Sequence, residues 1–135
     1  MIHLISFKTA KFDTTKERLN PFNPISGESV LIWLRENALG SSYSSTKPDT
    51  EDWGWYMDVS NDVSSYLVGS IAYTEKEPVL GEKIEWLIQI HKNRSLKEKI
   101  LRRNKMTADD ALVATILGAL RGDAAFTDIE VNGDA

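Results

Sequence analysis

Cysteine is absent from the 135 residues, and this excludes both disulfides and thiolate metal sites. The chain also has no run of about 18 apolar residues that could span a bilayer. The first residues lack the basic segment of a secretory signal, so we expect a cytoplasmic protein. Also missing are a Gly-rich phosphate loop, a G-x-S-x-G nucleophile elbow and a known nucleic-acid motif.

Composition is that of an ordinary globular chain, with 41% hydrophobic and 27% charged residues. We therefore expect residues 1–135 to form one domain, which is long enough to bury a core without disulfides or structural metal ions. The net charge of −4 disfavours indiscriminate binding to DNA or to anionic lipid, so no membrane partner is predicted.

Charge is distributed unevenly along the chain. Seven of the sixteen basic residues lie in the window 92–105, where Glu98 is the only acid. They are Lys92, Arg94, Lys97, Lys99, Arg102, Arg103 and Lys105. Acidic residues dominate the windows 49–62 and 75–85. We expect a molecule with a positive and a negative region.

Hydrophobic periodicity predicts the order β-α-β-β-β-α-α-β. Strands are expected at residues 2–7, 51–59, 66–73, 83–91 and 126–131, and helices at 26–39, 95–103 and 107–121. The segments 8–23, 41–50 and 74–81 are predicted to be loops. This order favours an α+β fold with helices on one face of a largely antiparallel sheet of about five strands, with ferredoxin-like as the nearest common plan.

The segment 51–59 is rich in aromatic and acidic side chains. As a strand it would place Trp53 and Trp55 on one face, with Tyr56 and Asp58 on the other. Indoles anchor interfaces and acids steer basic partners. Our leading hypothesis is therefore a non-enzymatic protein that docks a protein partner through Glu51, Asp52, Trp53, Trp55 and Asp58. The alternative for both indoles is the core.

The basic window supports a second hypothesis, which is binding of nucleic acid or another polyanion. Ser95-Leu96-Lys97-Glu98 is a capping box that should begin a short cationic helix there. In the structural alternative, this is a solvated helix whose last basic residues complement the helix dipole.

A third hypothesis is a small hydrolase or metal enzyme that combines carboxylates with His3 or His91. Their imidazoles could meet if the first and fourth strands were neighbours. Neither histidine belongs to a ligand spacing such as H-x-x-x-H, so no catalytic residue, metal or cofactor is predicted.

Two runs, Glu51-Asp52-Trp53-Gly54-Trp55-Tyr56 and Arg94-Ser95-Leu96-Lys97-Glu98-Lys99, resemble segments of small uncharacterised bacterial proteins of similar length. In size, acidity and aromatic content, the chain is also similar to cytoplasmic immunity proteins of bacterial toxin systems. These proteins share no single motif, so the resemblance implies partner binding but assigns no residue. The oligomeric state stays open.

Overall fold

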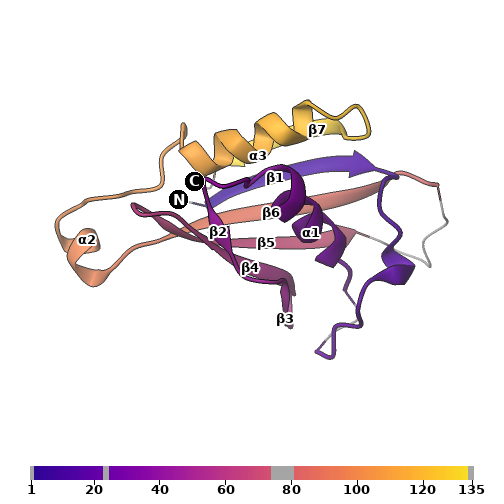
Figure 1. Cartoon of the computed structure of the whole chain (residues 1–135), viewed down its shortest axis with the longest axis horizontal. Coiled ribbons are helices and arrows are strands. Elements are labelled where there is room, and N and C mark those ends of the chain that lie inside the picture. The colour runs from indigo at the N-terminus through magenta and orange to yellow at the C-terminus, as the bar shows by residue number, and fades with distance from the viewer. Residues whose placement is uncertain (1, 23–24, 74–80, 134–135) are drawn as a thin grey trace.

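The computed structural model describes residues 2–22, 25–73 and 81–133 (Figure 1). Helices and strands alternate unevenly, with most strands in the middle of the chain. In chain order, the elements are β1 (Ile2–Thr9), the 3₁₀ helix η1 (Thr14–Lys16), α1 (Glu28–Asn37), β2 (Ser44–Ser45), β3 (Asp49–Glu51), β4 (Gly54–Ser60), β5 (Ser65–Tyr73), β6 (Ile84–Asn93), α2 (Leu96–Ile100), α3 (Ala111–Arg121) and β7 (Thr127–Gly133).

The strands form one antiparallel sheet in the order β2-β4-β5-β6-β1-β7, with β3 also paired to β4. The predicted α+β class and the meander of three consecutive strands, β4 to β6, are confirmed. The sheet has seven strands instead of about five, because the segment 41–50, predicted as a loop, contributes β2 and β3. A ferredoxin-like plan is not confirmed. The predicted loop at 74–81 lies, except for Gly81, outside the described residues.

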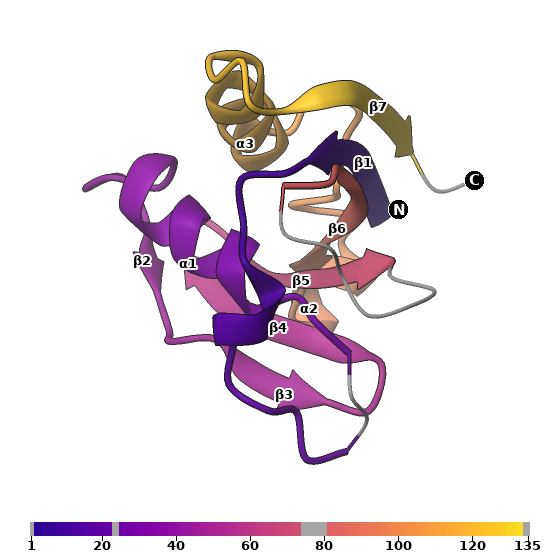
Figure 2. The same cartoon turned by 90° about the vertical axis from the view of Figure 1, so that its right-hand side faces the viewer.

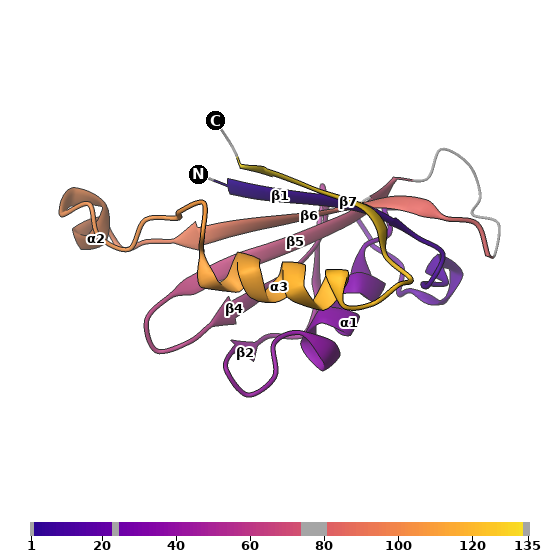
Figure 3. The same ribbon diagram turned by 90° about the horizontal axis from the view of Figure 1, so that it is seen from above.

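Helices α1 and α3 lie on the same face of the sheet (Figures 2 and 3). Strand β6 shows the consequence, since Trp86, Ile88 and Ile90 are fully buried on that face. Their neighbours Leu87 and Gln89 alternate to the other face and are only half-buried. No described helix covers this second face, which we call the open face. Two of the three predicted helices, α1 and α3, therefore lie on one side of the sheet, whereas α2 lies beyond its end (Figure 1).

Helix α1 begins differently from the prediction. Its N-cap is Gly27, not Ser26, and no side chain at that position caps the helix. Instead, the Glu17 carboxylate accepts hydrogen bonds from the backbone N–H groups of Gly27, Glu28 and Ser29 at 2.8, 3.1 and 3.0 Å. A Cβ at Gly27 would lie 2.3 Å from the backbone oxygen of Ser70, so glycine allows α1 to approach β5.

The other two helices follow their sequence signals more closely. The Ser95–Glu98 capping box is present, although α2 ends at Ile100 instead of near Arg103. Helix α3 starts at Ala111 instead of residue 107, because the Asp110 side chain caps it, and it buries Leu112, Val113, Ile116 and Leu120. Within the described chain, no helix combines the length and hydrophobicity needed to cross a bilayer.

Candidate functional site

The aromatic segment is a hairpin and not one long strand. Glu51 pairs with Gly54, so Asp52 and Trp53 form a two-residue turn between β3 and β4. Gly54 has φ +156°, and a Cβ there would lie 2.4 Å from Cγ2 of Ile71. This backbone break ends the alternation that the sequence predicted from Trp53 onward.

The break separates the two indoles that were predicted to share a face. Trp55 is 1% exposed, and its Nε1 donates to the backbone oxygen of Ile25 at 2.9 Å, so it belongs to the core under α1. Trp53 is 36% exposed and lies against Gly69 on the open face. Of the two tryptophans predicted to bind a partner, only Trp53 is accessible.

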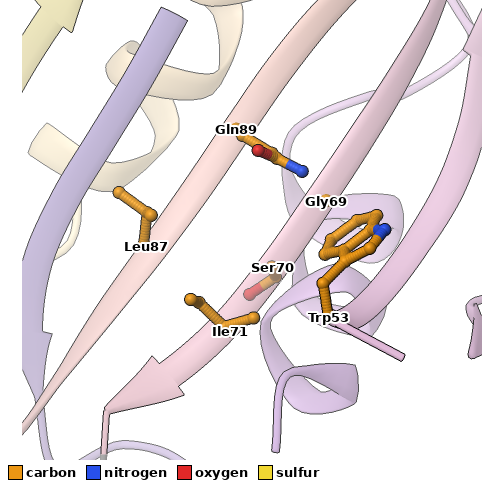
Figure 4. A pocket seen from close by; sticks show the side chains of 6 residues that line it. All are labelled: Trp53, Gly69, Ser70, Ile71, Leu87 and Gln89. Carbon is orange, nitrogen blue, oxygen red and sulfur yellow. The ribbon is translucent and has the colours of Figure 1, made fainter. Parts of the chain in front are cut away.

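A shallow hollow of about 360 Å³ lies beside the Trp53 indole on the open face (Figure 4). Its apolar lining comes from Trp53, Ile71 and Leu87, with the amide of Gln89 at one side. Gly69 forms part of its floor, and a Cβ there would lie 2.6 Å from the indole. The side chain that lies closest over Gly69 is therefore Trp53. This glycine makes room for the indole to lie on the sheet.

Acidic side chains gather at one side of this hollow. Asp49 pairs with Tyr56 across the β3–β4 ladder, so the two share the open face with Asp58, two residues further along β4. Burial, followed by the negative charges of Asp49, Asp58 and Glu51, raises the pKa of the Tyr56 phenol. We call Asp49, Glu51, Trp53, Tyr56 and Asp58 the acidic aromatic surface.

The predicted segregation of charge can be tested against the ion pairs of the described residues. These are Lys11–Asp123 at 2.9 Å, Lys92–Asp110 at 3.2 Å and the close pair Arg18–Glu28. None involves Asp49, Glu51 or Asp58, and only Lys92 of the seven clustered basic residues takes part. Among the described residues, the carboxylates of Asp49, Glu51 and Asp58 are therefore not joined to the basic window 92–105 by ion pairs, and most of the acidic window 75–85 lies outside the described residues.

Six of the seven basic residues, all except Lys92 in β6, lie on a projecting arm, residues 94–106, that includes α2 and extends beyond the end of the sheet (Figure 1). The arm turns back sharply, and Arg102 and Asn104 both have positive φ, at 54° and 53°. The Asn104 side chain anchors it, since its amide donates to the Val63 oxygen at 3.2 Å and it accepts from Ser64 Oγ at 3.2 Å.

A pocket of about 350 Å³ lies between the end of β6 and the arm. Its lining is cationic apart from one thioether and one imidazole, and consists of His91, Lys92, Arg94, Lys99, Lys105 and Met106. We call this the cationic pocket. Four of the seven predicted anion-binding residues line it, whereas Lys97, Arg102 and Arg103 do not.

Next to this pocket is a buried polar network. The carboxylate of Asp110 accepts from the Tyr66 hydroxyl at 3.0 Å, from Lys92 Nζ at 3.2 Å and from the backbone N–H of Leu112 at 2.9 Å. The side chains of Lys92 and Asp110 are 10% and 3% exposed. Burial and then the Asp110 hydrogen bond raise the pKa of Tyr66 far above its ordinary range. The network ties the start of α3 to β5 and β6.

The two histidines do not meet. Strands β1 and β6 are neighbours, but His3 pairs with Ile90, and His91 pairs with Ile2. Their side chains therefore point to opposite faces. His3 is buried, with Nε2 2.7 Å from the backbone oxygen of Thr107, whereas His91 is exposed and lines the cationic pocket. Among the residues that the structure describes, no three His, Asp or Glu side chains could hold a metal ion together.

Comparisons with protein families, with curated proteins and with solved structures found no match to this chain.

Sequence reasoning missed the residues that adjacent strands contribute to each site. Ile71, Leu87 and Gln89 reach the Trp53 hollow only because β5 pairs with β4 of the hairpin and β6 pairs with β5. The sequence indicates His91 as a candidate catalyst and gives little sign that it belongs to an anion site. Its position directly before Lys92 was the one available signal.

Proposed function

We propose that this protein is a non-enzymatic docking module that binds a cationic protein segment on its open sheet face. The observation that supports this most directly is the hollow beside the accessible Trp53 indole, next to the carboxylates of Asp49, Glu51 and Asp58, which form no ion pair with another described residue. An indole in a hollow is a typical anchor for a partner side chain. Carboxylates at its edge favour partners of positive charge and accelerate their association.

The positions of the residues refine the predicted partner site. Trp55 is left out of the proposed site, because its indole is buried under α1, and residues of the open face take its place. Trp53, Ile71 and Leu87 would supply the apolar contacts, and Glu51 and Asp58 would supply the charge. Asp52 lies in the hairpin turn beside Trp53 and stays part of the proposed partner site.

A capture experiment from the native host tests this site with two matched pairs of variants. Asp58→Lys and Trp53→Ala alter the acidic aromatic surface. Glu36→Lys and Ile32→Ala make the same kinds of change on exposed positions of α1, which lies over the other face of the sheet. We expect the first pair to lose a common basic partner and the second pair to retain it. Retention of that partner by all four variants would contradict the proposed site.

The salt dependence of capture gives an independent measure. Carboxylate steering weakens with ionic strength, because the Debye length falls from about 10 Å at 0.1 M to about 3 Å at 1 M salt. We expect Asp58→Lys to remove part of this salt dependence, whereas Trp53→Ala should lower affinity and leave the salt dependence in place.

A further inference from the structure

We infer that the cationic pocket binds a phosphate ester that carries at least two negative charges. This inference concerns a different site from the docking surface and does not depend on it. The pocket brings together the side chains of Arg94, Lys99 and Lys105, which form no ion pair with any described residue. Like charges that converge within a Debye length repel one another, and a bound polyanion relieves that repulsion.

The chemistry of the lining selects for phosphate. Arginine presents a planar fork of donors and lysine a compact charge, and both bind phosphate oxygens strongly. Arg94 uses Nη1 in a 3.3 Å hydrogen bond to the backbone oxygen of Arg103, which holds its guanidinium at the pocket. Lys92 is already paired with Asp110, so three positive charges remain for the ligand.

The size and composition of the pocket disfavour a polynucleotide. A volume of about 350 Å³ lies at the small end of the range for sites that enclose one small molecule. The described lining residues include no Trp, Tyr or Phe, and the His91 imidazole is their one aromatic ring, so the pocket offers no extended platform on which successive bases could stack. Lys97, Arg102 and Arg103 belong to the same arm but lie outside the lining. The recognised group is therefore the phosphate itself.

The same phosphate chemistry occurs in soluble metabolites and in lipid headgroups. Two aliphatic side chains of the arm, Leu96 and Ile100, are 73% and 70% exposed and lie four residues apart on α2. Exposed aliphatic groups beside clustered cations are typical of proteins that contact anionic bilayers. A lipid headgroup and a free phosphate ester are therefore the two sources to separate by experiment.

Calorimetric titration with inorganic phosphate and glycerol phosphate tests the pocket in the full chain. The key variant is Lys99→Ala with Lys105→Ala, and its control is Lys97→Ala with Arg102→Ala, which removes the same charge from the same arm. All four positions are exposed, so the fold should persist. We expect binding to weaken at least about tenfold in the pocket variant, since a hydrogen bond to a charged group contributes about that factor or more. The control should change binding less than about threefold, because its residues do not line the pocket.

A second experiment, with lipid vesicles, identifies the source of the phosphate. Phosphatidylcholine vesicles with and without phosphatidic acid are sedimented with the wild type, the pocket variant and Leu96→Ser with Ile100→Ser. Loss of sedimentation in the serine variant, with glycerol phosphate binding intact, supports a lipid headgroup. Glycerol phosphate binding by the wild type without sedimentation supports a soluble ester. The inference is overturned if no probe binds at about 10 mM, or if the pocket and control variants bind equally.

Discussion

The buried Lys92–Asp110 pair provides the sharpest test of the packing described above. In Asp110→Asn, the side-chain oxygen can still accept from Leu112 N–H and cap α3, but the negative charge is gone. Lys92 then keeps its charge with a side chain only 10% exposed and no carboxylate partner. We expect unfolding to become easier, because an uncompensated buried charge is costly.

The magnitude follows from the contacts. Removing one member of a buried ion pair destabilises a protein by about 3–5 kcal/mol. The aromatic ring of Tyr66, whose centroid lies 5.6 Å from Lys92 Nζ, continues to stabilise the ammonium. We therefore expect Asp110→Asn to cost about 3 kcal/mol. Asp110→Ala should cost about 4 kcal/mol, since it also removes the helix cap.

Urea unfolding, monitored by tryptophan fluorescence, measures these differences in the free energy of unfolding, provided that its dependence on urea concentration (the m-value) is unchanged. Asp109→Asn, one residue away and exposed, is the control and should change stability by less than about 0.5 kcal/mol. Adding Lys92→Met to Asp110→Asn should recover part of the lost unfolding free energy, because it removes the buried ammonium group that has lost its carboxylate partner. A loss below about 0.5 kcal/mol in Asp110→Asn would refute this reasoning.

Three further predictions use other parts of the fold. Glu17→Ala should destabilise the protein by about 2 kcal/mol in the same urea assay, because three backbone N–H groups at the start of α1 lose their acceptor; a change under about 0.5 kcal/mol would contradict the cap. Gly69→Ala should displace the Trp53 indole, because its Cβ would lie 2.6 Å from the ring, and acrylamide should then quench tryptophan fluorescence more strongly; unchanged quenching would argue against this contact. The pKa of Tyr66 is higher in the folded state than the ordinary tyrosine value of 10. The neutral phenol therefore contributes its full share to the free energy of unfolding below pH 10, and this share is lost as the pH rises towards the folded-state pKa. Folded wild type and Tyr66→Phe should therefore show the same tyrosinate absorbance at about pH 11, and a lower value in the variant would contradict the burial of that hydroxyl.

Local sequence signals predicted the elements with strong periodicity. Trp86, Ile88 and Ile90 alternate in β6, and Ser95 with Glu98 caps α2, because these patterns act over only a few residues. The strands β2 and β3 were missed because short Ser- and Asp-rich segments have low strand propensity. They form strands through pairing with β4.

Long-range contacts account for what the sequence could not reveal about the sites. The positive φ of Gly54 moved Trp53 to the other face. The sequence alone does not show whether a glycine within an apparent strand adopts such a positive φ. Glu17 caps α1 from ten residues upstream, and Lys99 joins Arg94 at the pocket only after the arm turns back. Composition indicated the two charged regions, but not which of their residues form a surface or a pocket.

Site-specific photo-crosslinking on the two faces of the protein tests the docking proposal most directly. A photoreactive side chain at Leu87 would sit in the hollow beside Trp53, and one at Ile32 would sit on the exposed side of α1. The proposal predicts that a basic protein becomes crosslinked in the native host through position 87 and not through position 32. Equal crosslinking at both positions, or crosslinking only at position 32, would contradict it.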